Sequence, residues 1–103
     1  MEQLERIQKQ EQNLDLAAKA VRDLEDAFSK YLLAHDALAE LSDYYQADVW
    51  MSDYEDDESG LLPPELMRGV LSEDGIYKVL TDNRDLLIRI NDITSELLQK
   101  ETE

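Results

Sequence analysis

Residues 7–38 read IQKQEQNLDLAAKAVRDLEDAFSKYLLAHDAL, and one face of this stretch recurs at alternating spacings of three and four residues. The first positions of the repeat are Ile7, Leu14, Val21, Phe28 and His35, and the second are Gln10, Ala17, Leu24, Tyr31 and Leu38. This alternation marks one face of an α-helix and is typical of coiled-coil-like packing. Leu4, Leu41 and Tyr45 extend the face, so we expect a helix over about residues 3–46.

A second helix is expected near the carboxyl-terminal end. Ser72 is a good N-cap, and Glu73 and Asp74 follow in the first turn, where acidic side chains interact favourably with the helix dipole. The apolar face then continues at Ile76, Leu80, Asn83, Leu87, Ile90, Thr94 and Leu97. The pattern favours one helix over about residues 73–100, although Thr81-Asp82-Asn83 can instead cap a separate helix.

The whole chain is expected to be one all-α domain over residues 1–103. It has 103 residues and no cysteine, and its sequence has no strand pattern and no internal repeat. No stretch has the roughly 20 apolar residues of a membrane span, and the amino terminus lacks the order of a signal peptide. These features predict a soluble, cytoplasmic protein that does not associate with membranes.

The two helices are expected to pair as a long antiparallel hairpin with a folded connector over about residues 47–72. In this pairing Ile76 lies near Tyr45, and Leu97 lies near Leu24. The first apolar positions of the longer helix then extend beyond its partner helix, and such stripes do not usually stay exposed. We therefore expect a homodimer that covers them; the alternative is that the first turns fray.

Negative charge is concentrated in the middle third of the chain. The net charge is −15, and residues 36–74 contribute twelve acidic residues against one base, Arg68, which is −11 of that total. A field of this sign repels nucleic acid and anionic membranes and favours basic partners or cations. The alternative explanation for the acidic composition is solubility alone.

The stretch LPPELMRGVLSED, residues 62–74, is expected to fold as a plug over the open end of the hairpin. Pro63 and Pro64 suit the first turn of a short helix, and Gly69 can end that helix in the left-handed conformation. Val70 and Leu71 then turn inward before the second long helix begins. The side chains expected to cover the hairpin end are Leu61, Leu62, Leu66, Val70 and Leu71.

The same region resembles a known family. The runs WMSDYEDDESGLLPPEL and LMRGVLSEDGIYKVLTDNRD are similar to the bacterial domain-of-unknown-function family numbered 4298, whose members are short, acidic and helical. The resemblance covers nearly the whole chain and is most specific at Trp50, Asp53, Tyr54, Gly60, Pro63, Gly69, Val70, Leu71, Ser72, Glu73 and Asp74. It implies an all-α fold and a bacterial or phage setting, and it implies no activity.

Residues 44–58, YYQADVWMSDYEDDE, form the candidate partner-binding segment. Aromatic side chains supply rigid contact area, and acidic side chains beside them select a basic partner. The candidate residues are Tyr44, Tyr45, Trp50, Asp53, Tyr54, Glu55, Asp56, Asp57 and Glu58. The alternative is that the aromatic residues pack under the plug while the acids stay solvated.

Chemistry at a metal or cofactor is not expected. The acids from Asp53 onward fail the calcium-loop pattern, because Glu58 occupies the glycine position. The pairs Glu55-x-x-Glu58 and Asp82-x-x-Asp85 resemble magnesium-binding pairs of all-α nucleotide pyrophosphohydrolases, but residues 55–58 run into Ser-Gly and two prolines, which weakens the helical geometry that the pair needs. His35 lies on the helix face without a catalytic partner.

The sequence therefore predicts a non-catalytic protein–protein interaction or adaptor protein without a cofactor, whose partner carries a basic patch. Trp50 and Tyr54 are the expected anchors, and residues 53–58 supply the attracting charge. The main alternative is an acidic nucleic-acid mimic that inhibits a DNA-binding protein, and the less favoured one is the pyrophosphohydrolase. Direct binding of nucleic acid is not expected.

Overall fold

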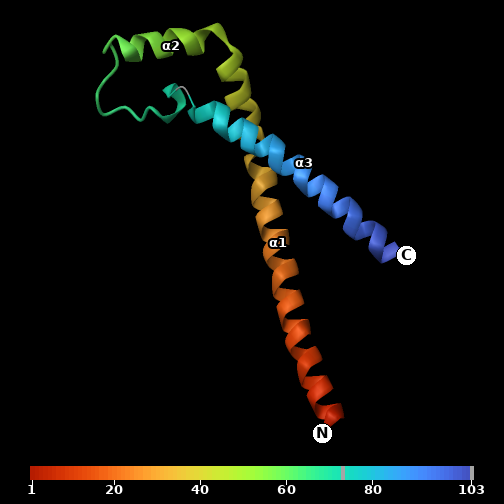
Figure 1. The fold of residues 1–103 in the computed structure, drawn as a ribbon. Helices are drawn as coiled ribbons and strands as arrows, with labels where there is room; N and C mark the ends of the chain where they lie inside the picture. Colours follow the sequence, from red (N-terminus) through yellow and green to blue (C-terminus); the bar gives the residue numbers. More distant parts are fainter. Residues whose placement is uncertain (73, 103) are drawn as a thin grey trace. The chain divides into compact units, whose positions relative to one another are not determined.

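The computed structural model describes residues 1–72 and 74–102, which form helices joined by short connections (Figure 1). The elements are α1 (Glu2–Gln46), α2 (Asp48–Glu58), the 3-10 helix η1 (Gly69–Leu71) and α3 (Gly75–Thr102). Within the described residues there is no strand, so the predicted all-α class is confirmed.

The two long helices agree closely with their predicted bounds. The first was expected over residues 3–46 and is observed as Glu2–Gln46. The second was expected over residues 73–100 and is observed as Gly75–Thr102; residue 73 lies outside the described residues. Because α3 runs through residues 81–83 without a break, these residues do not cap a separate helix.

The short helix of the connector was predicted in the wrong place. It was expected to begin at Pro63, but the observed helix is α2, which lies earlier. Residues 63–66 form a single turn, in which the Leu66 amide donates to the Pro63 carbonyl at 3.2 Å. A proline removes a backbone donor and suits such a turn as well as a first helical turn, so the two prolines did not distinguish these structures.

The glycine that ends a helix in the left-handed conformation is Gly60, at the end of α2. The sequence analysis had expected this role for Gly69. Gly60 has φ 74°, whereas Gly69 begins η1 and does not have a positive φ. The Gly60 amide donates to the Asp57 carbonyl and the Leu61 amide to the Asp56 carbonyl, each at 3.0 Å. This pair of hydrogen bonds is the Schellman arrangement that ends a helix, and it requires a left-handed residue at the Gly60 position.

The break between α1 and α2 occurs at Ala47, without glycine or proline. Ala47 is extended, with φ −82° and ψ 149°. Alanine has the highest intrinsic helix propensity, so local preference does not explain the break. The bend brings Trp50 of α2 against Tyr45 of α1, with ring centroids 5.0 Å apart, so aromatic packing across the bend offsets the lost helical hydrogen bonds.

The chain divides into two compact units, which we call the amino-terminal unit (residues 1–37) and the carboxyl-terminal unit (residues 38–103). The amino-terminal unit is a run of α1 in which no residue is buried. Its apolar face is largely exposed; the exposed fractions of Leu14 and Leu24 are 61% and 71%.

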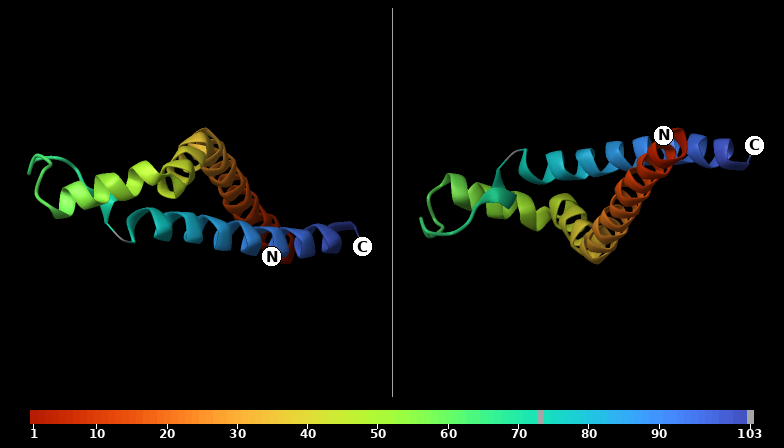
Figure 2. Two further views of the ribbon diagram at one scale, coloured as in Figure 1. Left: turned by 90° about the horizontal axis from the view of Figure 1, so that it is seen from above. Right: turned by 90° about the horizontal axis from the view of Figure 1, so that it is seen from below.

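The carboxyl-terminal unit contains the core. In both views of Figure 2 the segment after α2 turns back so that η1 lies beside α2, and η1 also contacts α3. Ile76 and Tyr45 take part in the same apolar cluster, in which Tyr45 meets the Trp50 ring. The antiparallel pairing of the two long helices stays a prediction. The proximity of Leu97 to Leu24 stays a prediction.

Candidate functional site

Three apolar side chains form the centre of the carboxyl-terminal unit. Trp50 is 9% exposed, Leu71 is 6% exposed and Ile76 is 3% exposed, and they come from α2, η1 and α3. Half-buried residues pack around them: Leu41, Tyr44, Tyr45, Tyr54, Leu62 and Leu80. The aromatic residues therefore pack beneath the connector, which the sequence analysis gave as the alternative to a partner-binding role.

Trp50 is packed against other groups of the protein and is not exposed as a binding anchor would be. Its ring meets Tyr45 edge to face at 5.0 Å and stacks on Tyr54 at 5.4 Å with an interplanar angle of 22°. Its indole Nε1 donates a hydrogen bond of 2.8 Å to the Val70 carbonyl. In this conformation Trp50 serves the core, and the hypothesis that it anchors a partner gains no exposed surface from the structure.

Tyr44 and Asp53 form a short polar contact beside this core. The Tyr44 hydroxyl donates to Asp53 Oδ2 at 2.6 Å, which links α1 to α2. The hydrogen bond to Asp53, with burial and the negative charge of Asp53 as further causes, raises the pKa of Tyr44 from 10.0 to about 12. Asp53, one of the candidate partner-binding acids, is therefore used in a contact within the protein.

Arg68 fixes the loop that follows α2. Its Nε donates to Asp57 Oδ1 at 2.6 Å, in an ion pair whose side chains are 34% and 16% exposed. Its Nη1 donates to the carbonyls of Pro64 and Leu66, and its Nη2 donates to the carbonyl of Pro63 at 2.8 Å. A planar guanidinium has the several directed donors that this arrangement requires. The charge count had identified Arg68 as the region's single base, but the sequence did not indicate its partners.

Of the remaining acids of α2, three are exposed and one, Asp56, is half-buried. Residues three and four apart share a helix face, so Asp53 and Asp57 lie on the side of Trp50. Asp48, Glu55 and Glu58 lie outside this inner side and are exposed, and within residues 1–72 and 74–102 they make no ion pair. Half-buried Asp56 is likewise without an ion pair in the described chain. The candidate acids thus divide into a paired inner set and an unpaired outer set.

The plug was predicted only in part. Leu71 is buried and Leu62 packs against the core, whereas Leu61 and Leu66 are 72% and 45% exposed. Val70 contributes its carbonyl to Trp50 but leaves its side chain 39% exposed. The difference follows from the observed turn at residues 63–66, which places Leu66 outside the helical face that the prediction assumed.

Ser72 caps the start of α3 as predicted, but α3 begins at Gly75, so Asp74 precedes its first turn instead of lying in it. The Ser72 Oγ accepts from the Gly75 amide at 3.0 Å and donates to the Gly69 carbonyl at 2.9 Å, so one hydroxyl joins η1 to α3. Asp74 follows and its carbonyl accepts from the Lys78 amide at 2.8 Å, while Glu73 lies outside the described residues. The capping serine was therefore informative in the sequence, whereas the prediction of an acidic first turn was wrong for Asp74.

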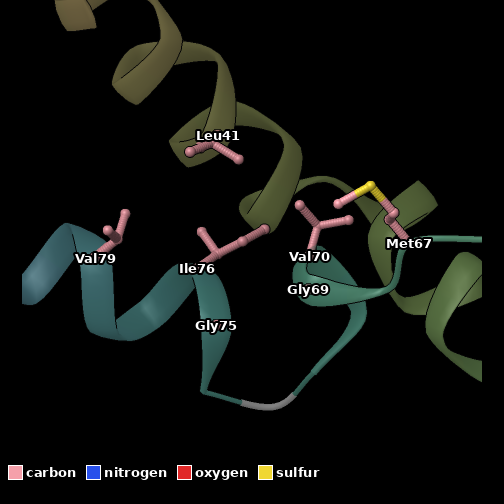
Figure 3. Close-up of a pocket in the computed structure, with 7 residues that line it drawn as sticks. All are labelled: Leu41, Met67, Gly69, Val70, Gly75, Ile76 and Val79. Atoms are coloured by element: carbon pink, nitrogen blue, oxygen red, sulfur yellow. The ribbon is translucent and has the colours of Figure 1, made fainter.

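An apolar groove of about 440 Å³ opens on the carboxyl-terminal unit (Figure 3). The end of α1, the loop with η1, and the first turns of α3 contribute its lining, which consists of Leu41, Met67, Gly69, Val70, Gly75, Ile76 and Val79. The sequence analysis did not assign Met67 or Val79 to any site. The groove depends on the loop folding back past α2, which helical periodicity alone does not predict.

The acidic pairs with enzyme-like spacing both lie on helices. α2 extends to Glu58, so the expectation that the Glu55-x-x-Glu58 segment is poorly helical was wrong, and Asp82-x-x-Asp85 lies in α3. Across the part of the chain that the structure describes, no three His, Cys, Asp or Glu side chains gather as a metal site would need. His35 meets the Tyr31 ring edge to face at 6.5 Å in the amino-terminal unit.

This architecture defines the class: an all-α protein with a long first helix and a short connector helix packed against its last helix. The family model described as "Domain of unknown function (DUF4298)" matches residues 7–93, and the chain belongs to this family. Neither a curated protein nor a solved structure matches the chain. None of the helices in the described residues is long and apolar enough to span a membrane.

The Tyr44–Asp53 contact predicts a high tyrosine titration step. A folded pKa of about 12 exceeds the ordinary value of 10.0, so the contact stabilises the fold fully below pH 10 and loses this effect as pH rises through 12. In an alkaline titration followed by tyrosinate absorbance, Tyr44→Phe removes the step near pH 12, and Asp53→Asn moves it to lower pH. Tyr77→Phe is the control and leaves that step in place; loss of the step in this control would contradict the assignment.

Replacement of Arg68 tests the loop contacts. Lysine can keep the charge near Asp57 but lacks the directed donors that reach three carbonyls, so Arg68→Lys should lower the free energy of unfolding by about 1–2 kcal/mol. Urea unfolding followed by the fluorescence of Trp50 measures this change. Arg84→Lys, on an exposed part of α3, is the matched control with an expected change within about 0.5 kcal/mol. Equal stability of both variants would show that the Arg68 contacts contribute little.

Proposed function

We propose that this chain is a non-catalytic interaction protein that binds a partner with a basic patch through the outer face of α2. The observation that carries the proposal is the division of the connector acids. Asp53 and Asp57 are held by Tyr44 and Arg68, while Asp48, Glu55 and Glu58 are exposed and, in the described chain, without an ion pair. Unpaired carboxylates on one helix face attract a basic surface and speed its encounter.

The rigidity of α2 supports the same proposal. The stacked Tyr45–Trp50–Tyr54 rings and the Trp50–Val70 hydrogen bond fix α2 from beneath. A binding face on a fixed helix loses less conformational entropy on association than a face on a free loop. The aromatic residues thus act in the proposed interaction by positioning the acidic face, and we place this interaction in the cytoplasm.

The test neutralises the outer face of α2 without changing its inner face. The variant Asp48→Asn, Glu55→Gln, Glu58→Gln should lose at least about tenfold in partner capture from host lysate at moderate salt, because it removes the charges that select a basic partner. Pull-down with quantitative mass spectrometry measures the loss, and Trp50 fluorescence verifies that the variant folds.

A matched control removes equal charge elsewhere. Asp85→Asn, Asp92→Asn, Glu96→Gln on α3 should capture the partner as the unchanged protein does. Equal loss in both variants would attribute capture to net charge and overturn the assigned face. Release of the captured protein by duplex DNA would favour the nucleic-acid mimic, and turnover of nucleoside triphosphates with magnesium would overturn the non-catalytic assignment.

We propose also that a second copy of the chain covers the apolar face of the amino-terminal unit. Large apolar side chains on this face, such as Leu14, Val21 and Leu24, are each more than half exposed, with exposed fractions of 61%, 64% and 71%. Residues 1–35 carry seven acids and five bases, a net charge of −2, so two such faces repel each other only weakly.

Replacement within this face tests the dimer. Leu24→Glu places a charge at the centre of the proposed contact and should convert a dimer to a monomer in multi-angle light scattering at micromolar concentration. Glu25→Gln, at the neighbouring exposed position, is the control and should leave the mass unchanged. A monomeric, folded wild-type protein at high micromolar concentration would overturn the proposal.

A further inference from the structure

The groove is a second surface, distinct from the outer face of α2. Figure 3 shows the side chains of Val70, Ile76 and Val79 pointing toward the α1 segment that carries Leu41. Ile76 forms the floor and is 3% exposed, while Val79 and Met67 at the rim are 44% and 91% exposed. The lining is aliphatic, and the groove volume of about 440 Å³ lies in the usual range for ligand sites.

Exposed apolar side chains extend the rim beyond the lining itself. Leu66 precedes Met67 in the loop and is 45% exposed, and Met67 projects with almost no cover from the rest of the unit. Methionine is flexible and polarisable, and it is common on surfaces that adapt to apolar partners. Burial of these side chains by a partner would remove apolar area from water and favour binding.

Each of the three chain segments that line the groove has an acidic neighbour in the sequence, and the basic neighbour of Val79, Lys78, is paired with Asp82 at 2.7 Å. Glu40 is adjacent to Leu41 on α1, Glu65 lies two residues before Met67 in the loop, and Asp74 precedes Gly75. These three side chains are exposed, and for residues 1–72 and 74–102 the structure gives them no ion pair. The single base of residues 36–74, Arg68, is held by Asp57 and three carbonyls.

An apolar groove in a segment of net charge −11 selects an occupant with apolar and basic faces. A second copy of this chain does not fit, because residues 36–74 carry a net charge of −11 and would meet a chain of net charge −15. An added β-strand has no edge to pair with in the described residues, and a polyproline segment docks on aromatic-lined grooves. A helix laid into an aliphatic groove is the recurring mode that remains.

We propose that this groove binds an amphipathic helix of a partner protein, whose apolar residues at helical spacing enter between Leu41, Val70 and Val79 and whose Lys or Arg side chains meet Glu40, Glu65 and Asp74. The inference rests on the proposed interaction function and names the class of partner. It assigns the apolar contacts to a surface that the outer face of α2 does not include.

The three methionines of the chain allow the two surfaces to be tested separately. Met67 lies at the groove, Met51 lies on α2 with 49% of its surface exposed, and Met1 is at the amino terminus. The full chain is labelled with ¹³C at the methionine methyls and titrated with a synthetic helical peptide that has leucine on one face and lysine on the other. The expected result is a saturable shift of the Met67 signal with Met1 unchanged.

Two variants on α3 show whether the shift arises from the groove. Val79→Lys places a cation in the groove and should weaken peptide binding at least about tenfold. Leu86→Lys makes the same substitution at a similarly exposed site (50%) outside the lining and should leave binding unchanged. Glu40→Gln should weaken binding and reduce its dependence on salt.

Each other outcome overturns the inference. A shift of Met51 without Met67 would place basic binding on α2 alone, which contradicts the groove while leaving the proposed function intact. Equal binding of a peptide with serine in place of leucine would exclude the apolar contact, and equal binding of a leucine–glutamate peptide would exclude the charge selection. A concentration-dependent Met67 shift without peptide would assign the groove to a second copy, and a peptide that moves no signal would exclude the proposed partner class.

Discussion

The hydrogen bond from the Trp50 indole to the Val70 carbonyl is the contact on which the carboxyl-terminal unit depends. It joins α2 to η1 across a separation of twenty residues in the chain, and it satisfies the single polar atom of the most buried aromatic side chain. The extended backbone at Ala47 is what turns α2 so that this contact forms. Burial of Trp50 with a satisfied donor outweighs the helical hydrogen bonds that the break removes.

Polar contacts add to the apolar packing that holds the loop of the carboxyl-terminal unit. Few apolar side chains are buried in this unit, so its loop needs polar contacts to adopt one conformation. Arg68 supplies them with one cation that meets Asp57 and three carbonyls, in a segment that contains no other base. The same cation pairs with Asp57, while Tyr44 holds the other inner acid, Asp53, and the outer acids of α2 stay exposed.

Periodicity predicted the long helices well because their apolar faces repeat over many turns, and Ser72 marked the start of α3 through a local capping bond. The structure of the connector was not predicted by helical periodicity. No glycine or proline announces the break at Ala47, because tertiary packing of Trp50 causes it. Of two glycines that could adopt the left-handed conformation, only Gly60 follows a helix end that requires it. The choice between Gly60 and Gly69 for the left-handed conformation depends on where α2 ends.

The candidate partner-binding segment also differs from its prediction because tertiary packing divides it into two faces. Residues 44–58 were considered as one acidic-aromatic segment, but on a helix they separate into faces, since side chains three and four apart share one side. Trp50, Asp53 and Asp57 take the inner side and form the connector. Asp48, Glu55 and Glu58 take the outer side, and the loop that Arg68 holds creates an apolar groove elsewhere on the unit. Recognition surfaces of a small acidic protein can therefore arise from the helical phase of a single short segment.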